Sequence, residues 1–229
     1  MLQTIKGKLY KAFIPAKSFA RRERSFWQNR NPENEDMHLQ EYWDQRFDSP
    51  NRKILVNIIS ERLKKATQRQ VSILEFGSYC GPNIDLIIRA NPDLDLKIFA
   101  VEPNKFACKF LQKELPAIQI FNINDVEFVN GELITQQIDI TFVNAVFYVV
   151  DQEHTKATIT KMAKFSRTIV IGDELDNVDG KESQFSRKTL VFHHPYRTWL
   201  RELGYTKFEL FKAPNPARAI NGILVATKI

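Results

Sequence analysis

From residue 71 onward, short apolar runs alternate with segments whose apolar residues recur at helical spacing. The runs predict strands at 71–76, 96–102, 118–124 and 167–173, and 138–150 predicts a strand that runs into a loop. The segments between them predict helices at 83–91, 105–115, 152–165 and 196–204. The strand runs are almost continuously apolar, which is typical of a parallel sheet covered by helices on both faces. This alternation predicts an open, doubly wound α/β sheet.

The end of the chain breaks the alternation. Two further strands are predicted at 207–213 and 221–229, and the residues between them are too few for a crossover helix. Strands joined in this way pair antiparallel. The full pattern therefore predicts seven strands in a mostly parallel sheet with an antiparallel last pair.

The residues before 71 predict helices and a separate arm. Ser49 and Pro50 give a capping residue and a first-turn proline to a helix at 49–66, and 38–47 predicts a short aromatic helix. Nearer the start, Leu2, Ile5, Leu9 and Phe13 fall at helical spacing up to Pro15, which should end that helix, and a polar linker follows. We therefore expect a helical N-terminal extension at 1–36 and one α/β domain at 37–229.

Charge sets this arm apart. Residues 1–30 hold eight Lys and Arg against one Glu, a net charge of +7, while the whole chain carries +6, so the other 199 residues sum to −1. The domain itself gives no electrostatic footprint for nucleic acid, and we expect no nucleic-acid partner. The basic, amphipathic arm indicates a peripheral contact with an anionic membrane, or a helix packed on the domain or on a partner.

Other features restrict the class of protein. Cys80 and Cys108 have no accompanying Cys/His cluster, which excludes a zinc finger and disfavours a disulfide scaffold. The longest apolar run, 138–150, contains Asp139 and Asn144 and is too short to span a bilayer. We expect a cytoplasmic protein without a metal, in contact with the membrane surface at most, and we leave its oligomeric state open.

The first strand ends in a distinctive loop, Ile73 to Asn83, with the sequence ILEFGSYCGPN. In an open parallel sheet, ligands bind beyond the carboxyl ends of the strands. Gly77 and Gly81 allow a tight turn and a close approach of a ligand. Their spacing is not the G-x-G-x-x-G of dinucleotide binding, and Glu75 would repel a pyrophosphate but suits a ligand with a positive group. An NAD-linked oxidoreductase is therefore disfavoured.

This loop resembles motif I of the class I S-adenosylmethionine-dependent methyltransferases. Glu75, Gly77 and Gly81 match the motif, and Tyr79 stands where its middle glycine usually is. The resemblance implies that Glu102, at the end of the second strand, binds both ribose hydroxyls. It further implies that Asp125 meets the adenine amino group, that Val126 packs on the ring, and that Asn144 lies at the end of the fourth strand beside the cofactor.

The resemblance places the acceptor between the fourth strand and the segment after the fifth. The expected residues are Asn144, Phe147, Tyr148, Asp173, His193, His194 and Tyr196. A histidine can take a proton from a hydroxyl near neutral pH, so His194 or His193 is the candidate base, with Asp173 as the reserve. A histidine that only caps the following helix explains the same sequence.

We interpret the chain as an S-adenosylmethionine-dependent methyltransferase that acts on a small-molecule or glycan-type acceptor, by O-methylation. The alternative is a catalytically inactive methyltransferase-like module that docks through its basic arm.

Overall fold

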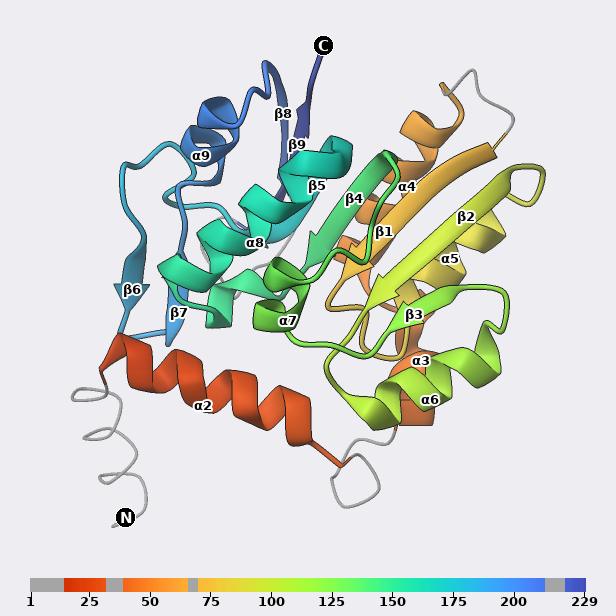
Figure 1. Ribbon diagram of the computed structural model, residues 1–229, viewed down its shortest axis with the longest axis horizontal. Coiled ribbons are helices and arrows are strands. Elements are labelled where there is room, and N and C mark those ends of the chain that lie inside the picture. Colours follow the sequence, from red (N-terminus) through yellow and green to blue (C-terminus); the bar gives the residue numbers. More distant parts are fainter. Residues whose placement is uncertain (1–14, 32–38, 66–69, 213–220) are drawn as a thin grey trace.

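The computed structural model describes residues 15–31, 39–65, 70–212 and 221–229, and it confirms the predicted sheet (Figure 1). Within these residues, seven strands pair in the order β3-β2-β1-β4-β5-β9-β8. They are β1 (Gln70–Phe76), β2 (Asp95–Val101), β3 (Gln119–Phe121), β4 (Ile138–Asn144), β5 (Ser166–Glu174), β8 (Lys207–Lys212) and β9 (Asn221–Thr227). The pairs among β1 to β5 are parallel, whereas β9 is antiparallel to both β5 and β8.

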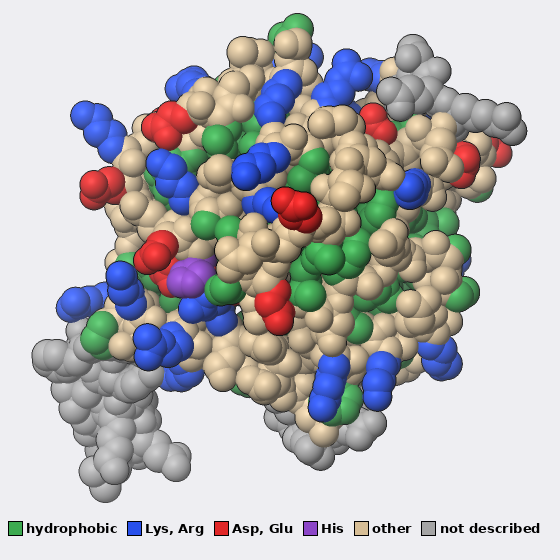
Figure 2. All heavy atoms as spheres, in the orientation of Figure 1, with side chains coloured by type: hydrophobic (Ala, Val, Ile, Leu, Met, Phe, Trp, Pro, Cys, Tyr) green, Lys and Arg blue, Asp and Glu red, His purple; other side chains and the backbone are tan. Residues whose placement is uncertain are grey.

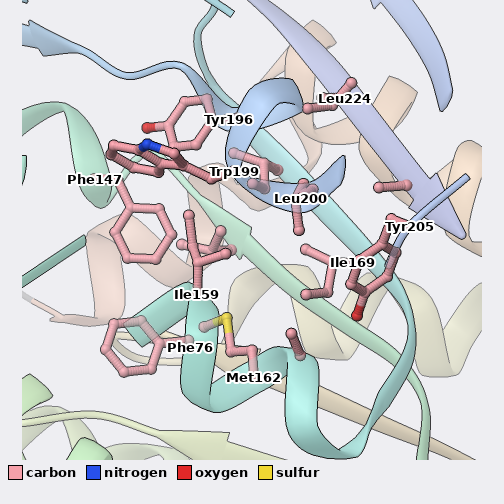
Figure 3. Close-up of a cluster of buried hydrophobic side chains, with 14 of the residues drawn as sticks. Phe76, Phe147, Ile159, Met162, Ile169, Tyr196, Trp199, Leu200, Tyr205 and Leu224 are labelled. Carbon is pink, nitrogen blue, oxygen red and sulfur yellow. The ribbon is translucent and has the colours of Figure 1, made fainter. Parts of the chain in front are cut away.

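Helices cover both faces of the sheet. One face carries α4 (Pro50–Leu63), α5 (Pro82–Ala90) and α6 (Lys105–Glu114), whose buried aliphatic side chains form one core cluster. The other carries α7 (Asp125–Asn130), α8 (Gln152–Phe165) and α9 (Tyr196–Glu202). There, Ile159 and Met162 of α8 and Trp199 of α9 pack over Ile169 of β5 (Figure 3). Both faces of the parallel strands are therefore buried, as their continuous apolar sequence predicts.

Several predicted details are confirmed. The Ser49 side chain accepts a hydrogen bond from the Arg52 backbone N–H and caps α4, with Pro50 as its first residue. The α8 helix spans the predicted residues, and Asp151 caps it by accepting from the His154 backbone N–H. Each cap satisfies a backbone donor that the first helical turn leaves unpaired.

One predicted strand is too long. The third is only β3, because Asn124 and Glu127 form a capping box that starts α7 directly after it. The fourth strand ends at Asn144 and leads into a loop as predicted, because Ala145 takes a positive φ of 56° and turns the chain into the short helix η3 (Phe147–Val149). The sequence reasoning also missed α7 and the small hairpin of β6 (Gln184–Ser186) and β7 (Val191–His193).

The main departure from the prediction concerns the arm. Pro15 precedes a helix, α2 (Ala16–Asn29), that runs along the carboxyl edge of the sheet (Figure 1). Its Phe19 and Ala20 are buried with Val149, Val150 and Phe192. For residues 16–29 the expected boundary at residue 36 is therefore wrong, because this helix packs on the domain. The helix predicted before Pro15 and most of the linker lie outside the described residues.

The remaining N-terminal elements are α3 (Leu39–Asp44) and η2 (Gln45–Phe47), which together match the predicted aromatic helix. None of the helices in the described ranges is long and apolar enough to cross a bilayer.

Candidate functional site

A cleft of about 350 Å³ lies at the carboxyl edge of the sheet, where the strand order reverses between β1 and β4. This is the position at which open α/β sheets bind their ligands. Segments from β1, β2, β4 and α2 line it, as do residues beside α7 and η3. The predicted site residues among its lining are Gly77, Tyr79, Glu102, Asp125, Asn144 and Tyr148.

The loop after β1 fits closely under the cleft. Gly77 has a φ of 75°, and a Cβ built on it would lie 2.5 Å from Cγ2 of Val146. Only glycine therefore leaves the backbone open to a ligand at this point. Gly81 is the N-cap residue of α5 and packs against Leu111, and it is not among the lining residues. Its predicted contact with a cofactor is replaced by a contact with the protein core.

Tyr79 occupies the position of the middle glycine and keeps a glycine-like backbone, with a φ of 48°. Its backbone N–H donates to Oε2 of Glu102 at 2.7 Å. Its ring meets the rings of Trp27 and Tyr42 edge-on, with centroids 6.1 Å and 5.2 Å away. The side chain that replaces hydrogen here thus joins the loop to α2 and α3, and it lines the cleft.

Glu102 has the geometry of a ligand for a vicinal diol. It is buried, it lines the cleft, and its two oxygens each accept one backbone N–H, from Tyr79 at 2.7 Å and from Asn104 at 2.8 Å. Each carboxylate oxygen can accept a further hydrogen bond. Burial raises the pKa of Glu102 to about 7, and the two backbone donors oppose that rise. The group therefore changes charge near neutral pH.

Glu75 lies behind the residues that line the cleft, whereas it was predicted to lie beside the ligand. It is buried and does not line the cleft, because Asn83 lies between them and donates to its Oε1 at 2.6 Å. Asn83 also accepts from Nε of Arg52, which reaches the Tyr42 hydroxyl. Burial raises the pKa of Glu75 to about 8, against the Asn83 hydrogen bond and the nearby Arg52 charge. In this structure Glu75 fixes Asn83, which itself lines the cleft.

The residues after β3 are divided between cleft and solvent. Asp125 lines the cleft, and its Oδ2 accepts from Nη1 of Arg24 on α2 at 2.9 Å. Val126 is 45% exposed and does not line the cleft, so its predicted packing on an adenine ring is not seen. The reason is the capping box, which makes Val126 the second residue of α7 and turns it outward.

The predicted catalytic residues do not reach the cleft. His194 is fully buried, with Nε2 3.0 Å from the carbonyls of Phe147 and Val150 and Nδ1 2.6 Å from the Ser183 hydroxyl. Two carbonyls at Nε2 require a proton there, so Nδ1 accepts from Ser183. Burial lowers the pKa of His194 to about 4, although both carbonyls oppose this. His194 is a neutral residue that ties the segment before α9 to η3.

His193 and Asp173 also lie outside the lining. Nδ1 of His193 is 3.6 Å from Oδ2 of Asp176, and Asp173 accepts from the Tyr196 hydroxyl at 2.7 Å. Tyr196 and Phe147 are buried in the core cluster beneath (Figure 3). Of the residues expected around the acceptor, the structure places only Asn144 and Tyr148 in the cleft. No group of three or more His, Cys, Asp or Glu side chains able to hold a metal occurs in the part of the chain that the structure describes.

Solved structures with this architecture were compared with the whole chain. Magnesium protoporphyrin IX methyltransferase from Synechocystis PCC 6803, with bound S-adenosylmethionine, matches at a TM-score of 0.61 and 11% identity, over 95% of this chain and 99% of that one. N-methyltransferase NodS from Bradyrhizobium japonicum WM9, with S-adenosylhomocysteine, gives 0.60 and 13%, over 91% and 96%. The sugar N-methyltransferase KedS8 from Streptoalloteichus gives 0.57 and 13%, over 82% and 91%.

The chain has the class I methyltransferase fold. No protein-family model and no curated protein matches the sequence. At these identities the structural matches establish the fold, and chemistry has to be argued from the residues of the cleft.

The methyltransferase fold here has a cleft wall that sequence reasoning missed. Arg24, Trp27, Gln28 and Arg30 of the α2 segment line the cleft, and the Asn104 side chain donates to the backbone carbonyls of Trp27 and Arg30. The signal was present in the sequence: Phe19, Phe26 and Trp27 fall at i, i+7 and i+8 directly after Pro15. The high positive charge of the segment instead favoured the prediction of a contact outside the domain.

Proposed function

We propose that this protein is an S-adenosylmethionine-dependent methyltransferase that methylates an oxygen of a small-molecule or glycan-type acceptor. The observation that carries the proposal is Glu102. A buried carboxylate at the end of β2, held by two backbone N–H groups and open to the cleft, suits the two ribose hydroxyls of the cofactor. Gly77 supports it, since its missing side chain keeps the loop accessible.

When bound, the cofactor supplies an activated methyl group on sulfonium. The chain's own contribution is to hold and orient: Glu102 for the ribose, Asp125 for the adenine end and Asn83, fixed by Glu75 and Arg52, for the amino-acid end. The α2 helix supplies one wall of the cleft, which reduces the access of water to it. Because the leaving group is already good, positioning in a dry cleft supplies much of the acceleration.

The lining includes no histidine among the described residues, so proton removal from a neutral hydroxyl has no evident base there. We therefore favour an acceptor oxygen that is already ionised. Arg24 also lines the cleft, but its Nη1 donates to Asp125 at the adenine end, so it does not mark the place of the acceptor. A cytoplasmic location is part of the proposal and rests on the two free, buried thiols, Cys80 and Cys108.

The proposal is tested by titration calorimetry with S-adenosylmethionine and S-adenosylhomocysteine. Glu102→Gln should weaken binding by about 1–3 kcal/mol, because charged hydrogen bonds to the ribose are lost. Affinity of the wild type should fall as pH is lowered through about 7, where Glu102 takes up a proton, and Glu102→Gln should remove that dependence. Glu61→Gln, an exposed position on α4, is the matched control. Absence of wild-type binding at millimolar cofactor would overturn the proposal.

A second candidate is an inactive module that binds the cofactor without turnover. It is favoured by one observation: α2 lies over the cleft, and Arg24 is bonded to Asp125 across it. Turnover separates the two candidates. Release of S-adenosylhomocysteine with any acceptor from a panel of carboxylate, phenol and sugar compounds supports the enzyme. Tight cofactor binding without turnover on the whole panel supports the module.

A further inference from the structure

The two faces of α2 differ sharply in character. Phe19, Ala20 and Trp27 face the domain. The opposite face is exposed and holds Lys17, Ser18, Arg21, Arg22, Ser25 and Asn29, with Phe26 at its border, 44% exposed. We call these seven residues the outer face of α2. No acidic side chain belongs to it.

Part of this surface is hollowed. An open hollow is lined by Ser18, Arg21, Arg22, Ser25 and Phe26. Guanidinium and hydroxyl groups are the donors that bind phosphate and carboxylate, and an aromatic ring beside them can enter the boundary of headgroups and acyl chains. The acids nearby are Glu23, paired with Arg22, and Glu153, which lies 4.0 Å from Lys17 and is highly exposed. In the space-filling view, Lys and Arg side chains gather near the start of α2 (lower left in Figure 2).

We propose that the outer face of α2 docks the protein on an anionic membrane surface. Three observations favour a bilayer over another protein. The face combines basic residues with one exposed aromatic ring, the composition of an interfacial helix. The sequence before α2 adds Lys6, Lys8 and Lys11 among apolar residues. The strong positive charge is confined to residues 1–30, whereas the rest of the chain sums to −1.

Docking in this way has a consequence for the cleft. Because α2 runs along the carboxyl edge of the sheet, a membrane on its outer face lies one helix away from the cleft that its inner face lines (Figure 1). An acceptor carried at the membrane surface would then be presented next to α2. The docking itself does not depend on methyl transfer, so it is testable whether or not the proposed function holds.

The experiment is sedimentation of the full chain with vesicles of phosphatidylcholine alone and with vesicles that also contain phosphatidylserine. Binding should require phosphatidylserine and be lost at high salt. Reversing one charge changes the attraction by about two charges, so Arg21→Glu should weaken binding by about tenfold or more. Phe26→Ser should weaken it without changing its salt dependence.

The matched control is Lys65→Glu, an equal charge reversal at an exposed position beyond the end of α4. It should bind as the wild type does, and thermal melts of each variant show whether the fold is kept. The proposal is overturned if phosphatidylserine vesicles do not sediment the wild type, or if Arg21→Glu and Lys65→Glu behave alike. Binding to polyglutamate that depends on Arg21, without vesicle binding, would assign the surface to an acidic protein and would also overturn it.

Discussion

Tyr79 lets the backbone conformation of the motif be tested separately from its side chain. Both Tyr79→Gly and Tyr79→Ala remove the ring and its edge-on contacts with Trp27 and Tyr42. Contacts of this kind contribute about 0.5–1.5 kcal/mol each, so both variants should lose about 1–3 kcal/mol in the free energy of unfolding. The two variants differ in the free energy that the left-handed backbone at position 79 costs them.

At a φ of 48° a side chain costs about 1–2 kcal/mol, which alanine still carries and glycine does not. Glycine loses about 0.4–1 kcal/mol through the greater freedom of the unfolded chain. The difference leaves Tyr79→Gly more stable than Tyr79→Ala by roughly 0.5–1 kcal/mol. Urea unfolding followed by circular dichroism measures both values.

The control reverses the order. At Lys109, an exposed position inside α6, alanine should be the more stable of the two by about 1 kcal/mol. If alanine is equal to or better than glycine at position 79 as well, the left-handed backbone is wrong. The account of why a tyrosine can stand at the middle glycine of the motif would then fail with it.

Three further predictions follow from the buried groups and from α2. Burial raises the pKa of Glu75 to about 8, so the folded state binds the proton of Glu75 more tightly than the unfolded state does. The wild type should therefore lose stability as pH rises from about 4.5 toward 8. Urea titrations at several pH values measure this loss, and Glu75→Gln should remove it. For His194 the pH dependence of stability has the opposite sign, because its pKa is lowered to about 4: the free energy of unfolding should fall as pH drops from about 6.5 toward 4. At neutral pH, His194→Ala should cost about 2–4 kcal/mol of stability, because two buried carbonyls lose their donor. The variant His193→Ala should leave turnover near normal. Deleting residues 1–30 should weaken cofactor binding in calorimetry, because Trp27 and Arg30 line the cleft, and unchanged affinity would show that α2 is not part of the site.

The sheet could be predicted because its signal is local. Each buried strand is a continuous apolar run, and Ser49 and Pro50 mark a helix start by their own chemistry. Gly77 could be predicted from its place at a strand end and Glu102 from the resemblance to the methyltransferases, and the parallel sheet brings both strand ends to one edge at the cleft.

The positions of Glu75 and His194 could not be predicted, because they depend on how deeply each side chain is buried and on contacts between residues distant in sequence. Glu75 was placed at the ligand because nothing in the sequence shows that Asn83 comes between them. His194 looked like a base, and only the fold brings the carbonyls of Phe147 and Val150 to its ring. A polar side chain at the carboxyl end of a strand can point into the core or into the cleft. Its position in the sequence alone does not decide which.

The position of α2 also sets an order of events during folding. Its burial partners Val149, Val150 and Phe192 come late in the chain, whereas Phe19 is near its beginning. Contacts this distant in sequence carry a large loop-closure cost before they return any stabilisation. On a ribosome, α2 leaves the exit tunnel before these partners, and it has no surface to pack on until they follow. Until then, an amphipathic basic helix with exposed phenylalanines is the segment most in need of a temporary partner.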